Sequence, residues 1–543
     1  MPTTLEPVNI ARRFAETAAA LPEKAAVIQG DRRVSFAELS ALTERYAGGL
    51  AAIGIEKGMR CVLMVPPGIE FFALTFALFR LGAVPVMVDP GMGVRNLGVC
   101  LQEARPEAFI GVPKAHVARV VLGWSKPTIR INVTVGRKLF WGGHTLSNLP
   151  EQRLAAIAET EREDVAAILF TSGSTGVPKG AVYTHGVFDA QVRVLRDHYR
   201  VGPEDVDVPT FPLFALFDAA LGATAVIPEM DFTRPAEVAP LNILNAAQAN
   251  GATMMFGSPA LLNVVGRYAD KYNIKLARMR HVFSAGAPVP PNVLERFARM
   301  LPEGARIHTP YGATEALPVC SIAHDEILTD VAARWAQGEG TCVGRPVGQV
   351  TVEIIRISDE PIAEWSDELR VPDGEVGEIT VRGAVVTQAY YNRPESDALA
   401  KMADGRGGVW HRMGDLGWRD AEGRIWFVGR KNQRVETEKG RLYTIQVEAV
   451  FNQHPKVFRS ALVGIGTRRC IPRKPVLIVE LEPGETATPA LEQELREIAW
   501  AYSHTREIDT FLVHPKFPVD IRHNAKIFRE KLAFWAAERL GMV

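Results

Sequence analysis

The sequence is poor in cysteine, and its cysteines follow no recognisable pattern. Cys61, Cys100, Cys320, Cys342 and Cys470 are scattered over 543 residues, and no two of them form a CxxC pair. From this spacing we expect neither a disulfide framework nor a cysteine-based zinc site. It favours a location in the reducing cytosol. The 12 histidines show no metal-ligand spacing either, so we interpret them as structural.

An excess of charge and a long apolar run are also missing. The chain has 62 Lys+Arg and 62 Asp+Glu, so its formal net charge is zero and it lacks the electrostatic footprint of a nucleic-acid-binding protein. The most apolar stretch, "FFALTFALFRLGAVPVMV", is interrupted by Arg80 and Gly82 and is read as a helix followed by a strand. The N-terminus lacks the basic-then-apolar pattern of a signal peptide. We therefore expect a soluble, cytoplasmic protein without a transmembrane segment.

Short apolar runs alternate with amphipathic segments through most of the chain. Apolar residues make up 47% and charged residues 23%, which is ordinary globular usage. Runs such as "RCVLMV", "AVPVMV", "AAILF" and "TAVIP" have the length of buried strands, and the segments between them have helical periodicity. Ser35 and Glu38 have the spacing of a capping box, which predicts that a helix begins there. This alternation predicts an α/β fold with mixed or mostly parallel sheets flanked by helices.

The pattern changes in the last third of the chain. Short β runs separated by turns predict a small β unit over about residues 345–431. A compact set of two helices and two strands follows, which is enough for a small α+β domain. We therefore predict a large N-terminal domain over residues 1–431 and a small mobile C-terminal domain over residues 432–543, joined at the polar segment 429–440.

Residues 171–180, "TSGSTGVPKG", combine glycines, hydroxyls and a lysine directly after the apolar run "VAAILF". Glycines let backbone amides approach an anion closely, and the hydroxyls and the lysine add donors and positive charge, so the segment suits a polyphosphate. It is not a Walker A loop, because Lys179 follows Gly176 by three residues and precedes Gly180. A flexible surface loop is the alternative for such a Ser/Gly-rich stretch.

Further motifs appear in a fixed order along the chain and give this segment a context. They are "SAGAP" (284–288), "YGATE" (311–315), "MGDLG" (413–417), "GRKNQRVETEKGRLYTIQVE" (429–448) and "NAKIFREKL" (524–532). Together with "TSGSTGVPKG" they resemble the signature motifs of the adenylate-forming superfamily of acyl-CoA synthetases, peptide-synthetase adenylation domains and luciferases. The resemblance spans nearly the whole chain and implies that ATP and Mg²⁺ are used to activate a carboxylic acid as its adenylate.

The resemblance implies a role for each matching residue. Glu315 would bind Mg²⁺, for which its hard carboxylate oxygens are suited, and Thr314 would donate to the α-phosphate. Lys526 would stabilise the charge of the adenylation transition state. The implied ATP- and AMP-binding residues are Thr171, Ser172, Gly173, Ser174, Thr175, Gly176, Lys179, Gly286, Ala287, Pro288, Tyr311, Gly312, Asp415 and Arg430.

The chain departs from the superfamily where a thiol acceptor would be handled. Asn432 stands in place of the usual hinge aspartate, Lys439 replaces a tunnel glycine, Ala525 replaces the glycine before the catalytic lysine, and Ala215 stands where many acyl-CoA synthetases have histidine. The overall pattern resembles the β-lactone synthetases of olefin biosynthesis. That resemblance implies that a long-chain 2-alkyl-3-hydroxy acid is adenylated and that its own 3-hydroxyl then closes a β-lactone.

Two alternatives remain at this stage. A long-chain fatty acyl-CoA synthetase or a fatty acyl-AMP ligase would use the same fold, and a catalytically inactive relative would serve as a binding module. The expected partners are the hydroxy-acid substrate and other enzymes of the same pathway, but no nucleic acid. A glycine-bounded loop, "GRKLFWGG" (136–143), is interpreted either as tucked packing or as a contact with a membrane or partner.

Overall fold

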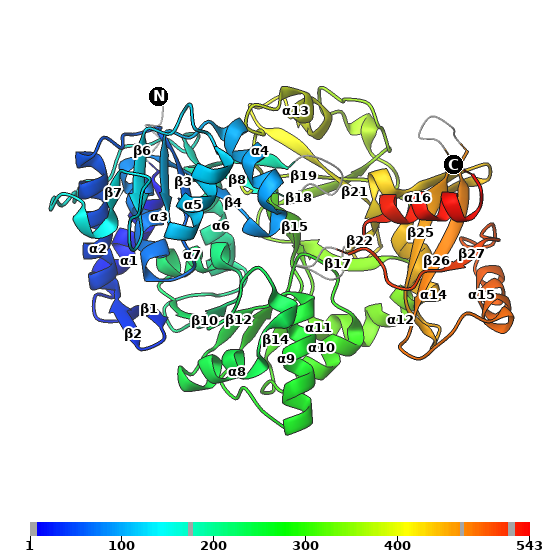
Figure 1. The fold of residues 1–543 in the computed structure, drawn as a ribbon. Coiled ribbons are helices and arrows are strands. Elements are labelled where there is room, and N and C mark those ends of the chain that lie inside the picture. Colours follow the sequence, from blue (N-terminus) through cyan, green and yellow to red (C-terminus); the bar gives the residue numbers. More distant parts are fainter. Residues whose placement is uncertain (1–7, 172–177, 467–471, 520–526, 543) are drawn as a thin grey trace.

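The structure is a computed structural model that describes residues 8–171, 178–466, 472–519 and 527–542. Within these ranges the chain forms two seven-stranded sheets, one eight-stranded sheet, a two-stranded ribbon and a three-stranded sheet. Figure 1 shows the first two sheets in the N-terminal part and the three-stranded sheet at the other end of the molecule. The predicted α/β class is confirmed.

The first sheet has the strand order β7-β6-β5-β3-β4-β8-β9. Its strands are parallel except for the last pair, β8 and β9, which form an antiparallel hairpin. The bounds are β3 (Arg60–Met64), β4 (Val84–Val88), β5 (Ala108–Gly111), β6 (Ile131–Thr134), β7 (His144–Thr145), β8 (Val165–Thr171) and β9 (Lys179–Thr184).

The second sheet has the order β14-β13-β12-β10-β11-β1-β2 and is parallel except for the edge hairpin β1–β2. In both sheets the antiparallel pair consists of strands that are consecutive in the sequence. Such strands can pair through a short connection, whereas parallel strands need a longer crossover. The bounds are β1 (Ala25–Gln29), β2 (Arg32–Ser35), β10 (Val206–Pro209), β11 (Thr224–Ile227), β12 (Met254–Phe256), β13 (His281–Phe283) and β14 (Arg306–His308).

Helices fill the space between these two sheets and cover their outer faces. The inner layer consists of α1 (Ile10–Ala20), α2 (Phe36–Ala52), α3 (Ile69–Leu81), α6 (His185–Asp197) and α7 (Pro212–Leu221). The first sheet is covered on its outside by α4 (Val94–Ala104) and α5 (Pro113–Leu122), and the second by α8 (Pro240–Ala249), α9 (Pro259–Tyr272) and α10 (Pro291–Ala298). The predicted capping box at the start of α2 is confirmed: Ser35 and Glu38 exchange side-chain and backbone hydrogen bonds.

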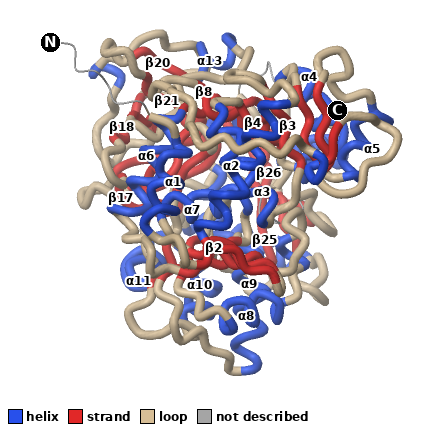
Figure 2. The backbone as a smooth tube through the Cα atoms, turned by 90° about the vertical axis from the view of Figure 1, so that its left-hand side faces the viewer, coloured by secondary structure: helices blue, strands red, loops and turns tan. Residues whose placement is uncertain are grey.

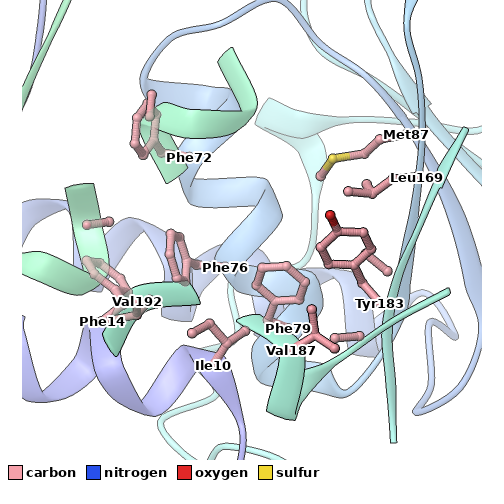
Figure 3. Close-up of a cluster of buried hydrophobic side chains, with 14 of the residues drawn as sticks. Ile10, Phe14, Phe72, Phe76, Phe79, Met87, Leu169, Tyr183, Val187 and Val192 are labelled. Carbon is pink, nitrogen blue, oxygen red and sulfur yellow. The ribbon is translucent and has the colours of Figure 1, made fainter. Parts of the chain in front are cut away.

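Aromatic side chains dominate the core between the sheets. Figure 3 shows Phe14 of α1 facing Phe76 of α3, and their ring centroids are 4.7 Å apart. Burying one such ring contributes roughly 1.5–3 kcal/mol relative to leaving it in water. Tyr183 of β9 belongs to this cluster (Figure 3), and its hydroxyl donates a 2.6 Å hydrogen bond to the Thr314 carbonyl, so the core also positions a polar group near the predicted site residues described below.

The eight-stranded sheet is antiparallel and follows the order β15-β16-β17-β22-β21-β19-β18, with β20 beside β21. It begins at Tyr311, before the predicted β unit at about 345–431, because β16 pairs with both β15 and β17. The bounds are β15 (Tyr311–Ala313), β16 (Ala316–Ser321), β17 (Thr341–Pro346), β18 (Thr351–Ile355), β19 (Gly377–Arg382), β20 (Lys401–Ala403), β21 (Val409–Arg419) and β22 (Ile425–Arg430). The helices of this part are α11 (His324–Glu326), α12 (Ala332–Ala336) and α13 (Pro394–Ala400).

The C-terminal part has hydrophobic clusters of its own on both faces of the sheet β25-β26-β27. One face is covered by α14 (Thr444–Phe451) and α15 (Pro489–Ala501), and the other by α16 (Arg529–Arg539). The strands are β25 (Val457–Ile465), β26 (Lys474–Leu481) and β27 (Phe511–Val513), preceded by the ribbon β23 (Val435–Thr437) and β24 (Gly440–Leu442). Among the described residues, no helix combines the length and apolar character that a membrane crossing requires.

Candidate functional site

The predicted phosphate-binding segment connects β8 and β9 in the sequence. Thr171 pairs with Lys179 in the register of the two strands, so the strands bring the first residue of the segment beside its lysine. The predicted donors Ser172, Gly173, Ser174, Thr175 and Gly176 lie outside the described residues. The Lys179 ammonium lies 5.0 Å from the ring centroid of Tyr390, a cation–π distance that places it next to the residues of the following motif.

Glu315, the predicted metal ligand, is held by the segment that contains Thr387 and Tyr390. The Tyr390 hydroxyl donates a 2.6 Å hydrogen bond to Glu315 Oε1. The Thr387 amide and hydroxyl donate to the Glu315 carbonyl at 2.9 and 3.1 Å. The neighbouring Thr314 carbonyl accepts a 2.6 Å hydrogen bond from Tyr183. The backbone and one carboxylate oxygen of Glu315 are thereby fixed.

The same segment is attached to the strand that carries Lys179. The Tyr391 amide donates to the Gly180 carbonyl at 2.7 Å, and the Val182 amide donates to the Ala389 carbonyl at 3.1 Å. These hydrogen bonds bring the predicted phosphate-binding Lys179 and Glu315 to one tyrosine, with Lys179 over its ring and Glu315 at its hydroxyl. Three segments that are far apart in sequence therefore meet at Tyr390.

Tyr311, Asp415 and Arg430 form a second group. Asp415 and Arg430 face each other in the register of β21 and β22, with 2.8 Å between Asp415 Oδ1 and the guanidinium. The Tyr311 hydroxyl donates to Asp415 Oδ2 at 2.6 Å. Burial raises the pKa of Asp415, and Arg430 and Tyr311 oppose that rise. The negative charge of Asp415 in turn raises the pKa of Arg430, so each group favours the charged form of the other.

The turn predicted to contact adenine follows β13. The Ser284 amide donates to the His308 carbonyl at 2.9 Å. The start of this turn therefore lies beside His308, which precedes Tyr311 by three residues in the sequence. Gly286 has a φ of 93°, in the left-handed region that favours glycine. The other two predicted contacts, Ala287 and Pro288, follow it directly. The Ser284 hydroxyl is buried and has no hydrogen-bond partner among the described residues.

Gly312 is needed for packing inside the YGATE motif. A Cβ at this position would lie 2.6 Å from the Ala316 carbonyl, closer than real Cβ atoms approach. The reversal from β15 to β16 therefore requires glycine between Tyr311 and Thr314.

The donor set fits a magnesium-bound nucleotide. Glu315 Oε2 forms no hydrogen bond or ion pair with another described residue, while Oε1 is occupied by Tyr390. No group of three or more Asp, Glu, His or Cys side chains suited to a metal occurs among the described residues, but Mg²⁺ in nucleotide sites takes only one or two carboxylates and completes its shell with water and phosphate. Asp415 Oδ1 is paired with the Arg430 guanidinium and Oδ2 accepts from Tyr311, but each carboxylate oxygen can accept more than one hydrogen bond, so the pair retains acceptor capacity for ribose hydroxyls.

Sequence reasoning missed Tyr390, Thr387 and Lys401. Lys401 is buried, donates to the Thr387 carbonyl and lies 5.7 Å from the Tyr390 centroid. Burial lowers the pKa of Lys401 to about 8, against the opposing charges of Glu315 and Asp397. A tyrosine pair before "NRP" and one lysine in a short strand carry no periodic or spacing signal, so only the fold reveals their position.

The predicted catalytic Lys526 lies outside the described residues, but its neighbour Arg529 connects α16 to the joint. Arg529 forms a two-pronged ion pair with the buried Glu448 of α14, with distances of 3.1 and 2.6 Å. It also donates to Gln433 at 3.3 Å. The structure therefore ties the start of the C-terminal helix to the segment around Asn432.

The joint itself is held by charged side chains on both sides of Asn432. Lys431 lies 3.0 Å from Glu378 Oε1 and donates to the Ser358 carbonyl at 2.8 Å. Arg434 pairs with Asp359 at 2.5 Å and with Glu436 at 2.7 Å. Asn432 itself is exposed, and Lys439 is exposed at the turn between β23 and β24.

Comparison with known proteins gives matches over nearly the full chain. The family described as AMP-binding enzyme matches residues 14–391. An olefin beta-lactone synthetase of Stenotrophomonas maltophilia is 51% identical over 555 residues, which cover 98% of this chain and 99% of that protein. A protein of the same name from Xanthomonas campestris is 51% identical over 519 residues, covering 94% and 92%. The predicted resemblance is thereby confirmed.

Solved structures share the fold at low sequence identity. An anthranilate CoA ligase (AuaEII) in complex with anthranoyl-AMP has a TM-score of 0.80 at 19% identity and covers 99% of this chain and 98% of its own. The amide bond synthetase McbA from Marinactinospora thermotolerans has a TM-score of 0.79 at 23% identity, with coverage of 97% and 99%. These likenesses support the two-part α/β architecture described above.

Proposed function

This chain belongs to the AMP-binding enzyme family, and we propose that it is an ATP-dependent β-lactone synthetase. In this proposal a long-chain 2-alkyl-3-hydroxy acid is first converted to its acyl-adenylate, with release of pyrophosphate. The 3-hydroxyl then attacks the acyl carbon, AMP leaves, and a four-membered lactone is formed. The name of the relatives at 51% identity supports this choice of product.

The arrangement around Tyr390 supports the adenylation half of the proposal. Lys179 supplies positive charge for the β- and γ-phosphates, and Thr314 supplies a donor for the α-phosphate. Mg²⁺ bound at Glu315 would neutralise charge on the departing pyrophosphate. Asp415, held by Arg430 and Tyr311, has remaining carboxylate acceptor capacity for the ribose hydroxyls. Lys526 is proposed to enter from the C-terminal domain to stabilise the transition state.

The observation that carries the choice of product is the restrained joint around Asn432. In the superfamily the thiol-transfer step needs the C-terminal domain to rotate at this joint. Here Lys431 and Arg434 are each bound to carboxylates of the preceding part of the chain or of the adjoining ribbon. Lys439 stands where a glycine commonly lines the thiol tunnel in the superfamily. An enzyme whose nucleophile is already on the substrate does not need that rotation, because proximity replaces a second binding step.

We also propose that residues 432–543 act as one small domain that carries Lys526. The separate hydrophobic clusters on the two faces of its sheet support this boundary. A cytoplasmic location is supported by Cys61, Cys100, Cys320 and Cys342, which are buried, unpaired thiols. Other enzymes of the same pathway remain proposed partners.

A comparison of two acids tests the proposal. The enzyme is given ATP, Mg²⁺ and either a 2-alkyl-3-hydroxy fatty acid or the same acid without the 3-hydroxyl, and no CoA. The proposal expects lactone and AMP from the first acid, and adenylation without turnover from the second. Steady AMP release from the second acid would show that another nucleophile takes the acyl group.

Adenylation itself is tested by ATP–pyrophosphate exchange. Lys526→Ala is expected to abolish exchange, while the control Lys531→Ala, on α16, leaves it unchanged. Equal exchange in the two variants would overturn the role of Lys526, and no exchange in the unaltered enzyme would overturn the proposed function.

A further inference from the structure

Residues 108–150 contain no acidic side chain. Over the same stretch the chain has six basic residues, Lys114, Arg119, Lys126, Arg130, Arg137 and Lys138, although Lys+Arg and Asp+Glu are equal at 62 each over the whole sequence. All of them except Arg119 are exposed. None of the six forms an ion pair with a carboxylate of a described residue. The stretch therefore carries an excess of positive charge, although Asp231 lies close enough for the charge of Lys114 to lower its pKa and Glu107 lines a cavity together with Arg130.

Large apolar side chains are exposed on the same stretch. On α5, Val121 is 72% exposed, and Val117, Val120 and Leu122 are exposed beside it; in the loop 136–143, Phe140 is 69% exposed next to Leu139. Soluble proteins rarely leave contiguous apolar patches in water unless the patch contacts something. We call these six residues, together with the basic residues around them, the α5 face.

The loop and the helix form one surface because aromatic contacts hold them together. His116 of α5 stacks on Trp141 with ring centroids 5.2 Å apart and an interplanar angle of 5°. Trp141 is anchored by a 2.9 Å hydrogen bond from its indole nitrogen to the Thr134 hydroxyl, and Phe140 packs against it at 5.3 Å. Phe140 is therefore presented by a fixed loop at the N-terminal end of α5, and Figure 2 shows α5 at the outer rim of the molecule.

The charges flank the apolar residues at both ends. Lys114 lies in the first turn of α5, and Arg137 and Lys138 lie in the loop that packs there; Lys126 and Arg130 follow the C-terminal end of the helix. A helix of this length spans about 15 Å. The α5 face thus has a central apolar stripe with cations at both ends, the pattern of helices that lie in a membrane interface.

We propose that the α5 face docks on the surface of a lipid bilayer with anionic headgroups. The valines and Phe140 would enter the boundary between headgroups and acyl chains, and the basic residues would contact lipid phosphates. A bilayer suits these features better than an acidic protein, because the exposed valines, leucines and Phe140 offer an acidic surface no group to pair with, whereas the headgroup boundary offers both acyl chains and phosphates. Docking would place the enzyme where long-chain acids are dissolved, but the inference rests on the surface and not on the proposed reaction.

Vesicle flotation with the full-length enzyme tests the proposal, without substrate or nucleotide. The protein is expected to float with vesicles of phosphatidylcholine and phosphatidylglycerol, and to do so several-fold less with phosphatidylcholine alone or in high salt. Phe140→Ser is expected to weaken binding about tenfold, and each of Lys126→Gln and Arg130→Gln about fivefold. The matched control is Trp500→Ser, since Trp500 is 71% exposed on α15.

The outcomes separate a bilayer from other occupants. Equal flotation of Phe140→Ser and Trp500→Ser, or equal binding to both kinds of vesicle, would overturn the proposal. A change in oligomeric state in Phe140→Ser without a change in flotation would mean that the face joins copies of this chain, which also overturns it. ATP–pyrophosphate exchange in vesicle-free buffer should be the same in all these variants, so failure here is distinguishable from failure of the proposed function.

Discussion

The Tyr390 hydroxyl lies 2.6 Å from Glu315 Oε1, and the Lys179 ammonium lies over the face of the same tyrosine ring. One side chain therefore contacts both the predicted metal ligand and the predicted phosphate-binding lysine. Because Oε1 accepts from the phenol, Oε2 is the oxygen that we expect to bind the predicted Mg²⁺. Tyr390 is a positioning residue in this account.

Tyr390→Phe should slow adenylation by about 10–100-fold, the effect of losing one hydrogen bond to a charged group. The loss should shrink as the Mg²⁺ concentration rises, because metal then restores the position of Glu315. ATP–pyrophosphate exchange measured across a magnesium titration checks this. The control is Tyr391→Phe, which changes the adjacent hydroxyl and leaves the Glu315 contact intact; equal effects of the two variants would contradict the account.

Asp415→Asn should weaken binding of AMP and ATP by about tenfold or more, because it replaces a charged acceptor beside Arg430. Isothermal titration with AMP measures this directly. Asp197→Asn, on the surface, serves as the control for a lost carboxylate. Unchanged AMP affinity in Asp415→Asn would show that the ribose does not bind at this carboxylate.

Asn432→Pro should leave lactone formation within about threefold, because the proposed reaction does not need rotation at the joint. Proline fixes φ near −65°, which suits the short 3₁₀ turn Lys431–Gln433 and stiffens it. Lactone yield and pyrophosphate exchange are measured on the same samples. Retained exchange with lost lactone would mean that the second half of the reaction requires a moving joint.

Asp207 of β10 and Asp218 of α7 form a buried pair of interacting carboxyls. Burial raises the pKa of Asp207 to about 7 and raises that of Asp218 as well. Because an unfolded aspartate ionises near pH 4, the neutral pair stabilises the fold at low pH, and this stability is lost as the pH rises through about 7. Nearby, Asp205 is paired with Arg280 at 2.7 Å.

In Asp218→Asn, Tm should therefore decrease less steeply between about pH 5 and pH 9 than in the unaltered protein. The free energy of unfolding near pH 9 should be higher by about 1–3 kcal/mol. Thermal unfolding followed by circular dichroism over this range checks the slope. The exposed Asp270→Asn should keep the slope of the unaltered protein. Parallel curves for the two variants would contradict a shared proton between Asp207 and Asp218.

The sequence was most informative where chemistry requires consecutive residues. The family was predicted from the YGATE and TSGSTGVPKG motifs, and the α/β class from the alternation of apolar runs with helical segments. Both signals can be read from the sequence because each motif and each hydrophobic period is set by neighbouring residues. Helix α2 began where its capping box predicted. The placement of each site residue within an active centre stays a prediction, since no bound ligand tests it.

Contacts between distant segments could not be predicted in this way. Tyr390 joins Glu315 and Lys179 only because residues 389–391 lie against β9, and nothing in "QAYYNRP" indicates that pairing. The start of the antiparallel sheet at Tyr311 was likewise hidden, because its first strand is only three residues long. The restraint of the joint depends on Lys431 and Arg434 finding carboxylates in the loop after β18 and in β19 and β23, which sequence spacing does not reveal.

The most direct measurement of the central claim is the product ratio in one reaction that contains a 2-alkyl-3-hydroxy fatty acid, ATP, Mg²⁺ and an excess of CoA, analysed by mass spectrometry. The account predicts that β-lactone and AMP form at the same rate as without CoA and that thioester is absent. Accumulation of the acyl-CoA thioester at the expense of lactone would contradict it.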